Sequence, residues 1–242
     1  MTRFALISGS ETSCDSWNHM LDRLRECGHT GRVYGLDEIS WAHGIKAAIQ
    51  ALADSIGCGN ETILVGHSIA GLFLPSLGEA IGATSQIYIA ALIPQPGRSV
   101  LDQLLVSEEI FSRSWAEEYE AMRQSTDPLI SYRSFLEWHL FHDCPPQSVE
   151  QYWMKTDLPL RKIYETPHPA PDPRKNCHFI VCTGDRTLQP RAQRLSSELL
   201  PCARVSEIDT GHCPHIAAPA DLADLILSHT RSAHRQSAAS VG

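Results

Sequence analysis

ETILVGHSIAG, residues 61–71, is the stretch of the sequence that decides the fold. Residues 61–66 form an apolar, β-branched run of strand length, and the residues from Ile69 to Ile81 are rich in alanine and leucine, which favours a helix. A serine between a strand and a helix lies on a tight turn that presents its hydroxyl group above the sheet. The sequence therefore predicts Ser68 as a nucleophile. The alternative interpretation is that Ser68 only caps the helix.

The residues around Ser68 are small, as a tight turn requires. The usual pattern is Gly-x-Ser-x-Gly, and here Gly66 takes the first glycine position while Ala70 takes the last, with Gly71 just beyond it. Small residues are needed at positions 66 and 70 because the strained turn brings backbone segments close together. Pro75 is expected to kink the helix that follows or to strain its first turns.

Strand-like and helix-like segments alternate on both sides of this turn. Apolar runs of strand length also occupy residues 4–8, 30–34, 86–92, 178–183 and 204–208. Helical periodicity marks residues 17–24, 41–56, 190–200 and 219–230. Such alternation forms a mostly parallel sheet with helices on both faces, so the predicted fold class is α/β.

Residues 99–170 interrupt this alternation with short helix-like pieces that carry three of the five tryptophans. We predict that this segment is a helical cap inserted into a core made of residues 1–98 and 171–232. The polar residues 233–242 are expected to be a disordered tail. A chain of 242 residues suits one domain with such an insertion.

The composition favours a small-molecule partner. A formal charge of -8 provides no basic footprint for nucleic acid or for an anionic membrane. No apolar run reaches the roughly 18 residues of a membrane span, and the first residues lack the apolar stretch of a secretory signal, so we expect a cytoplasmic protein. The eight cysteines and twelve histidines show no metal-ligand spacing, and we expect reduced thiols, no metal and no cofactor. The oligomeric state is not encoded in these features.

A serine nucleophile needs a base, and His212 has the position for it. It lies in DTGHCPH, residues 209–215, after a predicted strand and shortly before the last helix. Gly211 is expected to let the loop turn the imidazole back over the sheet. His215 competes for this role, although a structural role suits it better, and His67 is expected to point away from the nucleophile.

The third member of a triad should be a carboxylate in the loop after the strand at residues 178–183. Asp185 is the carboxylate available there. In the common pattern the acid stands three residues after a glycine, and Thr187 occupies that position here. Asp143 is therefore kept as the first alternative and Asp209 as the second.

Taken together, these residues resemble the α/β-hydrolase superfamily, and more narrowly its small members, which include plant methylesterases, hydroxynitrile lyases and bacterial esterases. The resemblance extends over nearly the whole chain. It rests on five stretches: FALISGSETSCDSW, ILVGHSIAG, YIAALIPQPGRSVLDQL, FIVCTGDRTLQP and IDTGHCPHIAAPADLADLI.

The resemblance also implies an oxyanion hole. In this family the first strand usually ends in His-Gly, and the turn after it contributes one backbone N–H group. Here the pair is Ser8-Gly9, and the implied donors are the backbone N–H groups of Ser10 and Ile69. Ser8 in place of histidine removes a side chain that supports the loop, but it does not remove the donors. The alternative interpretation is that residues 8–10 only make a turn.

We therefore expect a serine hydrolase that cleaves an ester, thioester or lactone of a small apolar or aromatic molecule through an acyl-enzyme. Substrate contacts are assigned to Trp138, His142 and Trp153. A lyase or cyclase on the same scaffold, with His212 as a base, is the first alternative. Lyase relatives depend on a cation in the cap, for which the sequence offers Lys155, Arg161 and Lys162. A ligand-binding module that retains the triad is the second alternative.

Overall fold

The computed structural model describes residues 1–59, 62–106, 110–111, 115, 117–118, 121, 128–154, 158–169, 172, 176–200 and 204–239. Six strands form one sheet in the order β2-β1-β3-β4-β5-β6, and every neighbouring pair is parallel. The strands are β1 (Arg3–Ile7), β2 (Thr30–Tyr34), β3 (Thr62–His67), β4 (Ser85–Ile89), β5 (Asn176–Cys182) and β6 (Arg204–Ile208). Each coincides with a predicted strand to within three residues at its ends, and the α/β fold class is confirmed.

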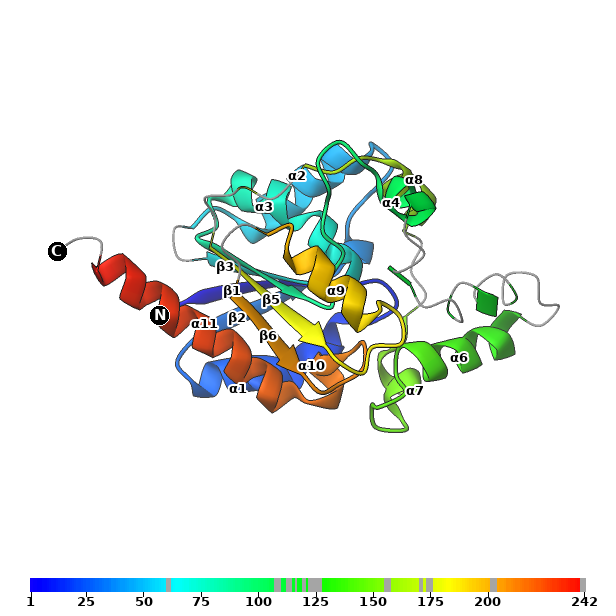
Figure 1. The fold of residues 1–242 in the computed structure, drawn as a ribbon. Helices are drawn as coiled ribbons and strands as arrows, with labels where there is room; N and C mark the ends of the chain where they lie inside the picture. Colours follow the sequence, from blue (N-terminus) through cyan, green and yellow to red (C-terminus); the bar gives the residue numbers. More distant parts are fainter. Residues whose placement is uncertain are drawn as a thin grey trace.

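Helices cover both faces of the sheet (Figure 1). One face packs on α1 (Asn18–Glu26) and α11 (Pro219–Ala239), and the other packs on α2 (Ile45–Ile56) and α3 (Leu74–Ile81), with α9 (Pro190–Ser197) beside β5. Alternate residues of a strand point to opposite faces, so Leu64 joins the core on the α2 side while Ile63 and Val65 join the core on the α1 side. Because both faces are buried, β3 is apolar almost throughout.

The amphipathic helix α1 shows how the sequence determines this packing. Met20, Leu21 and Leu24 recur at intervals of one and three residues and are buried against the sheet. Burial of such a side chain stabilises the fold by about 1.5–3 kcal/mol. Gly28, two residues after the end of α1, has a φ of 80°, which a residue with a side chain adopts only at a cost.

The helix after Ser68 differs from the single kinked helix that the sequence predicts. The chain first makes the 3-10 turn η3 (Ser68–Leu72) and then begins α3 at Leu74. Pro75 stands in the first turn of α3, where its missing N–H group would have no helical partner in any case. The proline therefore starts a new helix instead of kinking an existing one.

The last helix is longer than predicted. It was expected to end near Thr230, but α11 continues to Ala239. The segment expected to be a disordered tail is thus helical up to that residue, and residues 240–242 lie outside the described part of the chain.

Between β4 and β5 the structure has short helices beyond the carboxyl ends of the strands, on the right of Figure 1. They are α4 (Val100–Val106), α6 (Pro128–His139), α7 (Ser148–Tyr152) and α8 (Leu160–Glu165). Apolar residues of α6 and α7 form a separate cluster with Cys213 and Ile216, at the start of α10 (Pro214–Ala217). The remaining short helices are η1 (Cys14–Trp17) and η2 (Leu36–Glu38). The exact limits predicted for the cap, residues 99 and 170, remain a prediction.

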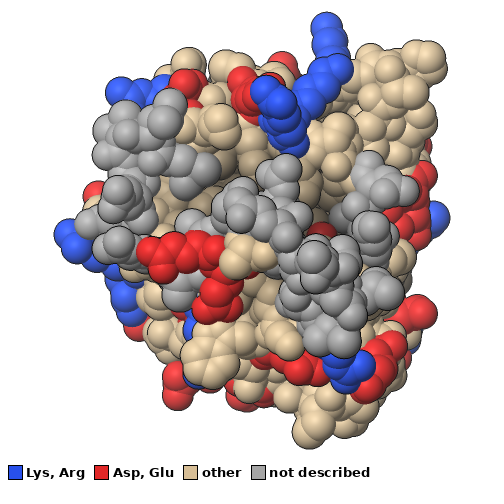
Figure 2. Space-filling view, turned by 90° about the vertical axis from the view of Figure 1, so that its right-hand side faces the viewer, with Lys and Arg blue, Asp and Glu red and all other residues tan. Residues whose placement is uncertain are grey.

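The strand order reverses between β1 and β3. From β1 the chain crosses to β2 on one side, whereas β3 lies on the other side of β1. In open parallel sheets, ligands bind at the carboxyl ends of the strands where the order reverses in this way. Figure 2 views the molecule from this end, where both acidic and basic side chains lie on the surface.

The described residues contain neither a membrane-spanning helix nor a cluster of metal ligands. None of the helices in this part of the chain is long and apolar enough to cross a membrane. Within the same residues, no group of three or more His, Cys, Asp and Glu side chains is arranged to hold a metal ion.

Candidate active site

Ser68 lies on a strained turn directly after β3. Its φ angle is 56°, a left-handed conformation that residues with a side chain seldom adopt. The turn leads at once into η3, so the backbone N–H groups at the start of this helix lie beside the serine. Such strain is typical of a nucleophile held above a sheet, and a serine that only caps a helix has no need of it.

The turn requires residues without a Cβ atom at three positions. A Cβ on Gly9 would lie 2.9 Å from His67 Nδ1, and one on Gly66 would lie 2.9 Å from two side-chain carbons of Leu74. A Cβ on Gly71 would lie 2.3 Å from the backbone oxygen of Leu92. On the helix side of Ser68, Gly71 is therefore the position that has no room for a side chain. The methyl group of Ala70 is accommodated in the core.

We expect Gly71→Ala to destabilise the protein by about 3 kcal/mol, because the new methyl group meets backbone that cannot easily move. Urea unfolding followed by circular dichroism measures the change. Gly82→Ala is the control, since its φ of 68° is strained but nothing lies within 4 Å of the added carbon. That change should cost only roughly 1–2 kcal/mol. Equal losses in the two variants would contradict the close packing of Gly71 on Leu92.

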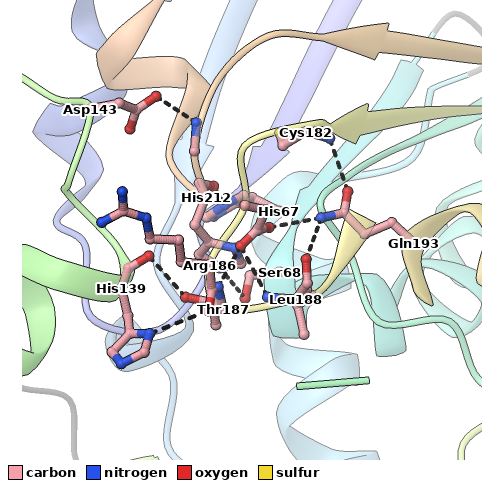
Figure 3. A network of polar contacts seen from close by, with 12 residues as sticks. His67, Ser68, His139, Asp143, Cys182, Arg186, Thr187, Leu188, Gln193 and His212 are labelled. Carbon is pink, nitrogen blue, oxygen red and sulfur yellow. Dashed lines mark hydrogen bonds and ion pairs between the residues drawn. The ribbon is translucent and has the colours of Figure 1, made fainter. Parts of the chain in front are cut away.

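His212 contacts both Ser68 and Asp185, and Figure 3 shows its side chain beside Ser68. Its Nε2 atom is 3.0 Å from Ser68 Oγ, and its Nδ1 atom is 2.8 Å from Asp185 Oδ2. A carboxylate can only accept, so Nδ1 carries the proton and Nε2 offers its lone pair to the serine hydroxyl. The side chains of His212 and Asp185 are 3% and 0% exposed, so water does not compete for this hydrogen bond.

The carboxylate of Asp185 is held by four donors. Oδ1 accepts from the backbone N–H groups of Thr187 at 2.7 Å and Leu188 at 3.0 Å. Oδ2 accepts from Gln193 Nε2 at 2.8 Å and from His212. Thr187, which occupies the position where the common pattern has the acid, instead contributes its backbone N–H group to hold Asp185.

The two alternative acids have other contacts. Asp143 accepts a short hydrogen bond from the backbone N–H of Gly211 through Oδ2, so it holds the loop that carries His212. Asp209 accepts from Thr183 Oγ1 at 3.1 Å. Neither hydrogen bond involves the His212 ring, and among the three candidates Asp185 is the one that contacts it.

Gly211 is required for space. The φ angle of Gly211 is not positive, so its conformation does not require glycine. A Cβ at this position would, however, lie 2.5 Å from both Asp143 Oδ1 and His142 Cε1. The conformational role that the sequence predicts for this glycine is therefore wrong, and its role is steric, because the cap residues Asp143 and His142 lie directly on it.

The two other histidines of this region support the loop. His67 Nε2 donates to the backbone oxygen of His212 at 2.7 Å. His215 stacks on Trp17 with 4.2 Å between the ring centres, and neither of its nitrogens has a hydrogen-bond partner among the described residues. Burial, with a contribution from His212, lowers the pKa of His215 to about 3. Burial also holds the pKa of His67 well below its usual value, so both rings are neutral at pH 7.

The loop after β1 approaches Ser68 through Gly9. Ser8 is buried and contacts Thr12, with its Oγ atom 3.2 Å from both the backbone oxygen and Oγ1 of Thr12, and it accepts from Trp17 Nε1 at 3.4 Å. The serine found in place of the usual histidine thus still supports the loop.

Among the described residues, no hydrogen bond engages the backbone N–H of Ser10. Ile69, the second residue of η3, stands where helical N–H groups lack a partner. Their role as oxyanion donors remains a prediction.

Residues 152–154 fasten this loop from the cap side. The backbone N–H groups of Ser13 and Met154 donate to the oxygens of Tyr152 and Glu11, respectively. Trp153 Nε1 donates to Glu11 Oε2 at 3.1 Å, and Glu11 has a φ of 69°. The residue Trp153, expected to contact substrate, therefore also holds the loop that carries Ser10.

The two other predicted substrate contacts lie around the loops of Asp185 and His212. Trp138 is 54% exposed, and the Arg186 guanidinium lies 4.2 Å from the centre of its ring. His142 is half-buried against Gly211, and burial lowers its pKa. Contact of these residues with a substrate remains a prediction.

Of the three cations that the sequence offers for a lyase, the two within the described residues have their observed contacts away from the triad. Arg161 pairs with Glu165 on the surface of α8. Lys162 Nζ lies 3.8 Å from the position of a Cβ on Gly44, at the start of α2. Lys155 lies outside the described residues.

Comparisons with known proteins agree with the fold. Among solved structures, polyneuridine aldehyde esterase is similar with a TM-score of 0.76 at 17% identity, covering 95% of this chain and 99% of that chain. A pyrethroid hydrolase, PytH, gives a TM-score of 0.73 at 20% identity and covers 93% and 96% of the two chains. Tomato methylketone synthase I with 2-tridecanone gives 0.68 at 16%, covering 96% and 98%. At such identities these likenesses show the fold alone.

Sequence comparison shows the family. The chain is 24% identical over 200 residues to a protein of Phoma sp. named "Probable hydrolase R7", with 75% of this chain and 74% of that protein covered. The model of the alpha/beta hydrolase family matches residues 17–225, which is well over half of the chain. The resemblance noted in the sequence is thereby confirmed, and this chain belongs to the alpha/beta hydrolase family.

Proposed function

We propose that this protein is a serine hydrolase that cleaves a carboxylic ester of a small apolar or aromatic molecule. The observation that carries the proposal is the continuous hydrogen-bonded path from Ser68 Oγ through His212 to Asp185. A serine hydroxyl is a weak nucleophile by itself, and an adjacent base held in the correct tautomer activates it. The reaction needs no cofactor.

The reaction proceeds in two steps. Ser68 Oγ attacks the ester carbonyl carbon while its proton passes to His212 Nε2, and the imidazolium is stabilised by Asp185. The same proton is then delivered to the alkoxide as the ester C–O bond breaks, which leaves an acyl group on Ser68. Water, deprotonated by His212, attacks this acyl group and releases the acid and the free serine.

Negative charge develops on the carbonyl oxygen in both steps. We assign its stabilisation to the backbone N–H groups of Ser10 and Ile69, which belong to the two loops that meet at Gly9 and Ser68. A donor of this kind contributes about 3–4 kcal/mol to the stability of the transition state. Residues 152–154, through their bonds to the loop after β1, help to hold Ser10 in place.

Three aromatic side chains of the predicted cap support the proposed substrate class. Trp138, His142 and Trp153 offer flat surfaces to an apolar or ring-containing group. Two proteins of similar fold are named as a polyneuridine aldehyde esterase and a pyrethroid hydrolase, which supports an ester as the cleaved group. Thioesters and lactones require the same triad and belong to the same test.

The test is covalent labelling followed by turnover. A fluorophosphonate probe should label the protein at Ser68, as peptide mass spectrometry can locate, and a para-nitrophenyl ester should be turned over many times. The Ser68→Ala variant is the blank for both assays. A panel of methyl esters, lactones and acyl thioesters then identifies the substrate class.

Each other outcome has a distinct meaning. Labelling of Ser68 without repeated turnover would favour a ligand-binding module. Turnover that persists in Ser68→Ala would contradict the acyl-enzyme and favour chemistry in which His212 acts as a base without a covalent intermediate.

A further inference from the structure

We infer that Gln193 is a positioning residue for the reaction and that it orients the carboxylate of Asp185. This inference rests on the proposed function, because it concerns how the triad is held. Gln193 lies on α9, eight residues after Asp185, and its side chain is 2% exposed. Figure 3 shows it reaching from its helix toward Cys182, Leu188 and the middle of the hydrogen-bond network.

The amide group of Gln193 connects three parts of one loop. Its Oε1 atom accepts from the backbone N–H of Cys182 at 3.0 Å, at the end of β5. Its Nε2 atom donates to the backbone oxygen of Leu188 at 2.7 Å and to Asp185 Oδ2 at 2.8 Å. Only one orientation of the amide satisfies these partners, because Cys182 supplies a donor where Leu188 supplies an acceptor.

The hydrogen bond from Gln193 to Asp185 links Gln193 to the orientation of His212. Gln193 and His212 donate to the same oxygen, Oδ2, while Oδ1 is held by two backbone groups. A carboxylate held at both oxygens cannot rotate, so the direction in which Oδ2 accepts from His212 is fixed. The imidazole in turn points Nε2 at Ser68, and a small misplacement of such a group lowers the rate strongly.

The isosteric change Gln193→Glu tests this role because it replaces the donor by a group that titrates. While the introduced carboxyl group keeps its proton, it can still donate to Asp185. Once it ionises, two carboxylates face each other in a buried site. Burial and a neighbouring negative charge both raise the pKa of a carboxylic acid, so this ionisation should fall within the usual assay range.

The measurement is the second-order rate of fluorophosphonate labelling at Ser68 as a function of pH. We expect Gln193→Glu to label about 10- to 100-fold more slowly than the natural protein near pH 8.5 and to approach its rate near pH 5.5. A merely structural role would give a loss that does not depend on pH. A labelling ratio that stays constant across this range would overturn the inference.

Gln189→Glu is the matched control. It makes the same chemical change at the start of α9, where the amide donates to Phe111 at 3.0 Å and does not contact Asp185. Its labelling ratio should be independent of pH. If Gln193→Glu does not fold, Gln193→Met removes the donor without adding charge, and it should slow labelling over the whole pH range while Gln189→Met does not.

A second readout does not depend on activity. The proton between His212 Nδ1 and Asp185 Oδ2 should give a far-downfield NMR resonance, which Gln193→Glu should shift or abolish as pH rises and Gln189→Glu should leave in place. If Ser68 of the natural protein is not labelled at all, the proposed function fails, and this resonance decides the role of Gln193 by itself. An unchanged resonance in Gln193→Glu would refute that role.

Discussion

Asp185→Asn is expected to lower kcat by about 10,000-fold while the protein remains folded. The loop around Asp185 determines how an asparagine would bind. The backbone N–H groups of Thr187 and Leu188 need an acceptor, so the amide oxygen would take the place of Oδ1. The NH₂ group would then face His212 Nδ1 and force the proton of the neutral ring onto Nε2, where it blocks acceptance of the serine proton.

Burst and steady-state kinetics with a para-nitrophenyl ester measure this loss, and circular dichroism checks the fold. Asp143→Asn is the control, because an amide oxygen can still accept from Gly211 and the His212 ring is not contacted. It should retain most of the activity. Near-normal turnover in Asp185→Asn, with a large loss in Asp143→Asn, would move the role of the acid to the cap.

Acid is expected to lower the stability of the folded protein strongly. Burial lowers the pKa values of His178 and His215 to about 3 and that of His229 to about 4, so all three rings are neutral in the folded protein. In the unfolded chain, histidine titrates near 6.5. The stability that these groups contribute is therefore complete above pH 6.5 and is lost as pH falls toward their folded values, because only the unfolded state takes up protons there.

The magnitude follows from 1.36 kcal/mol for each pH unit and each proton. Between pH 7 and pH 5, each of the three histidines should lower the free energy of unfolding by roughly 2 kcal/mol. Together they should lower it by about 6 kcal/mol. This is comparable to the whole stability of a typical domain, about 5–15 kcal/mol. We therefore expect cooperative unfolding near pH 4–5, at a pH where the carboxylates alone would have little effect.

Urea unfolding at pH 7.5, 6 and 5 measures this dependence. His215→Phe should reduce the number of protons taken up on unfolding by one and so make the pH dependence of stability less steep. The variant should fold, since the phenyl ring retains the stacking on Trp17 and the ring nitrogens have no partner to lose in the described chain. His19→Phe, at an exposed position, is the control and should leave the dependence unchanged. An equal pH dependence in the natural protein and His215→Phe would show that this ring does not contribute.

The strands and the turn at Ser68 could be predicted from sequence because their signals are local. A buried strand such as β3 is apolar over successive residues, and the turn after it has its small residues Gly66, Ala70 and Gly71 within six positions. Asp185 could be predicted as the acid because it is the carboxylate in the loop that follows β5. The usual spacing would place an acid at the position of Thr187, whereas the carboxylate that contacts His212 stands two residues earlier in the chain, at Asp185.

Contacts between distant segments could not be predicted in this way. Gln193 is one glutamine on a helix, and no residue near it in sequence shows that its amide meets Asp185. The bonds of residues 152–154 to the loop after β1 join segments about 140 residues apart, as the separation of 142 between Glu11 and Trp153 shows. Periodicity does not report such pairs, because it describes only which face of an element is buried.

The separation of 144 residues between Ser68 and His212 also has a consequence for biosynthesis. During translation, Ser68 and the strands β1 to β4 are synthesised before Asp185 and His212. Under the proposed mechanism, a chain that ends before His212 lacks the base and cannot carry out acyl transfer. Ester turnover would therefore report completed translation and folding of the whole polypeptide, and a refolding experiment could use it to time the last docking event of the C-terminal strands.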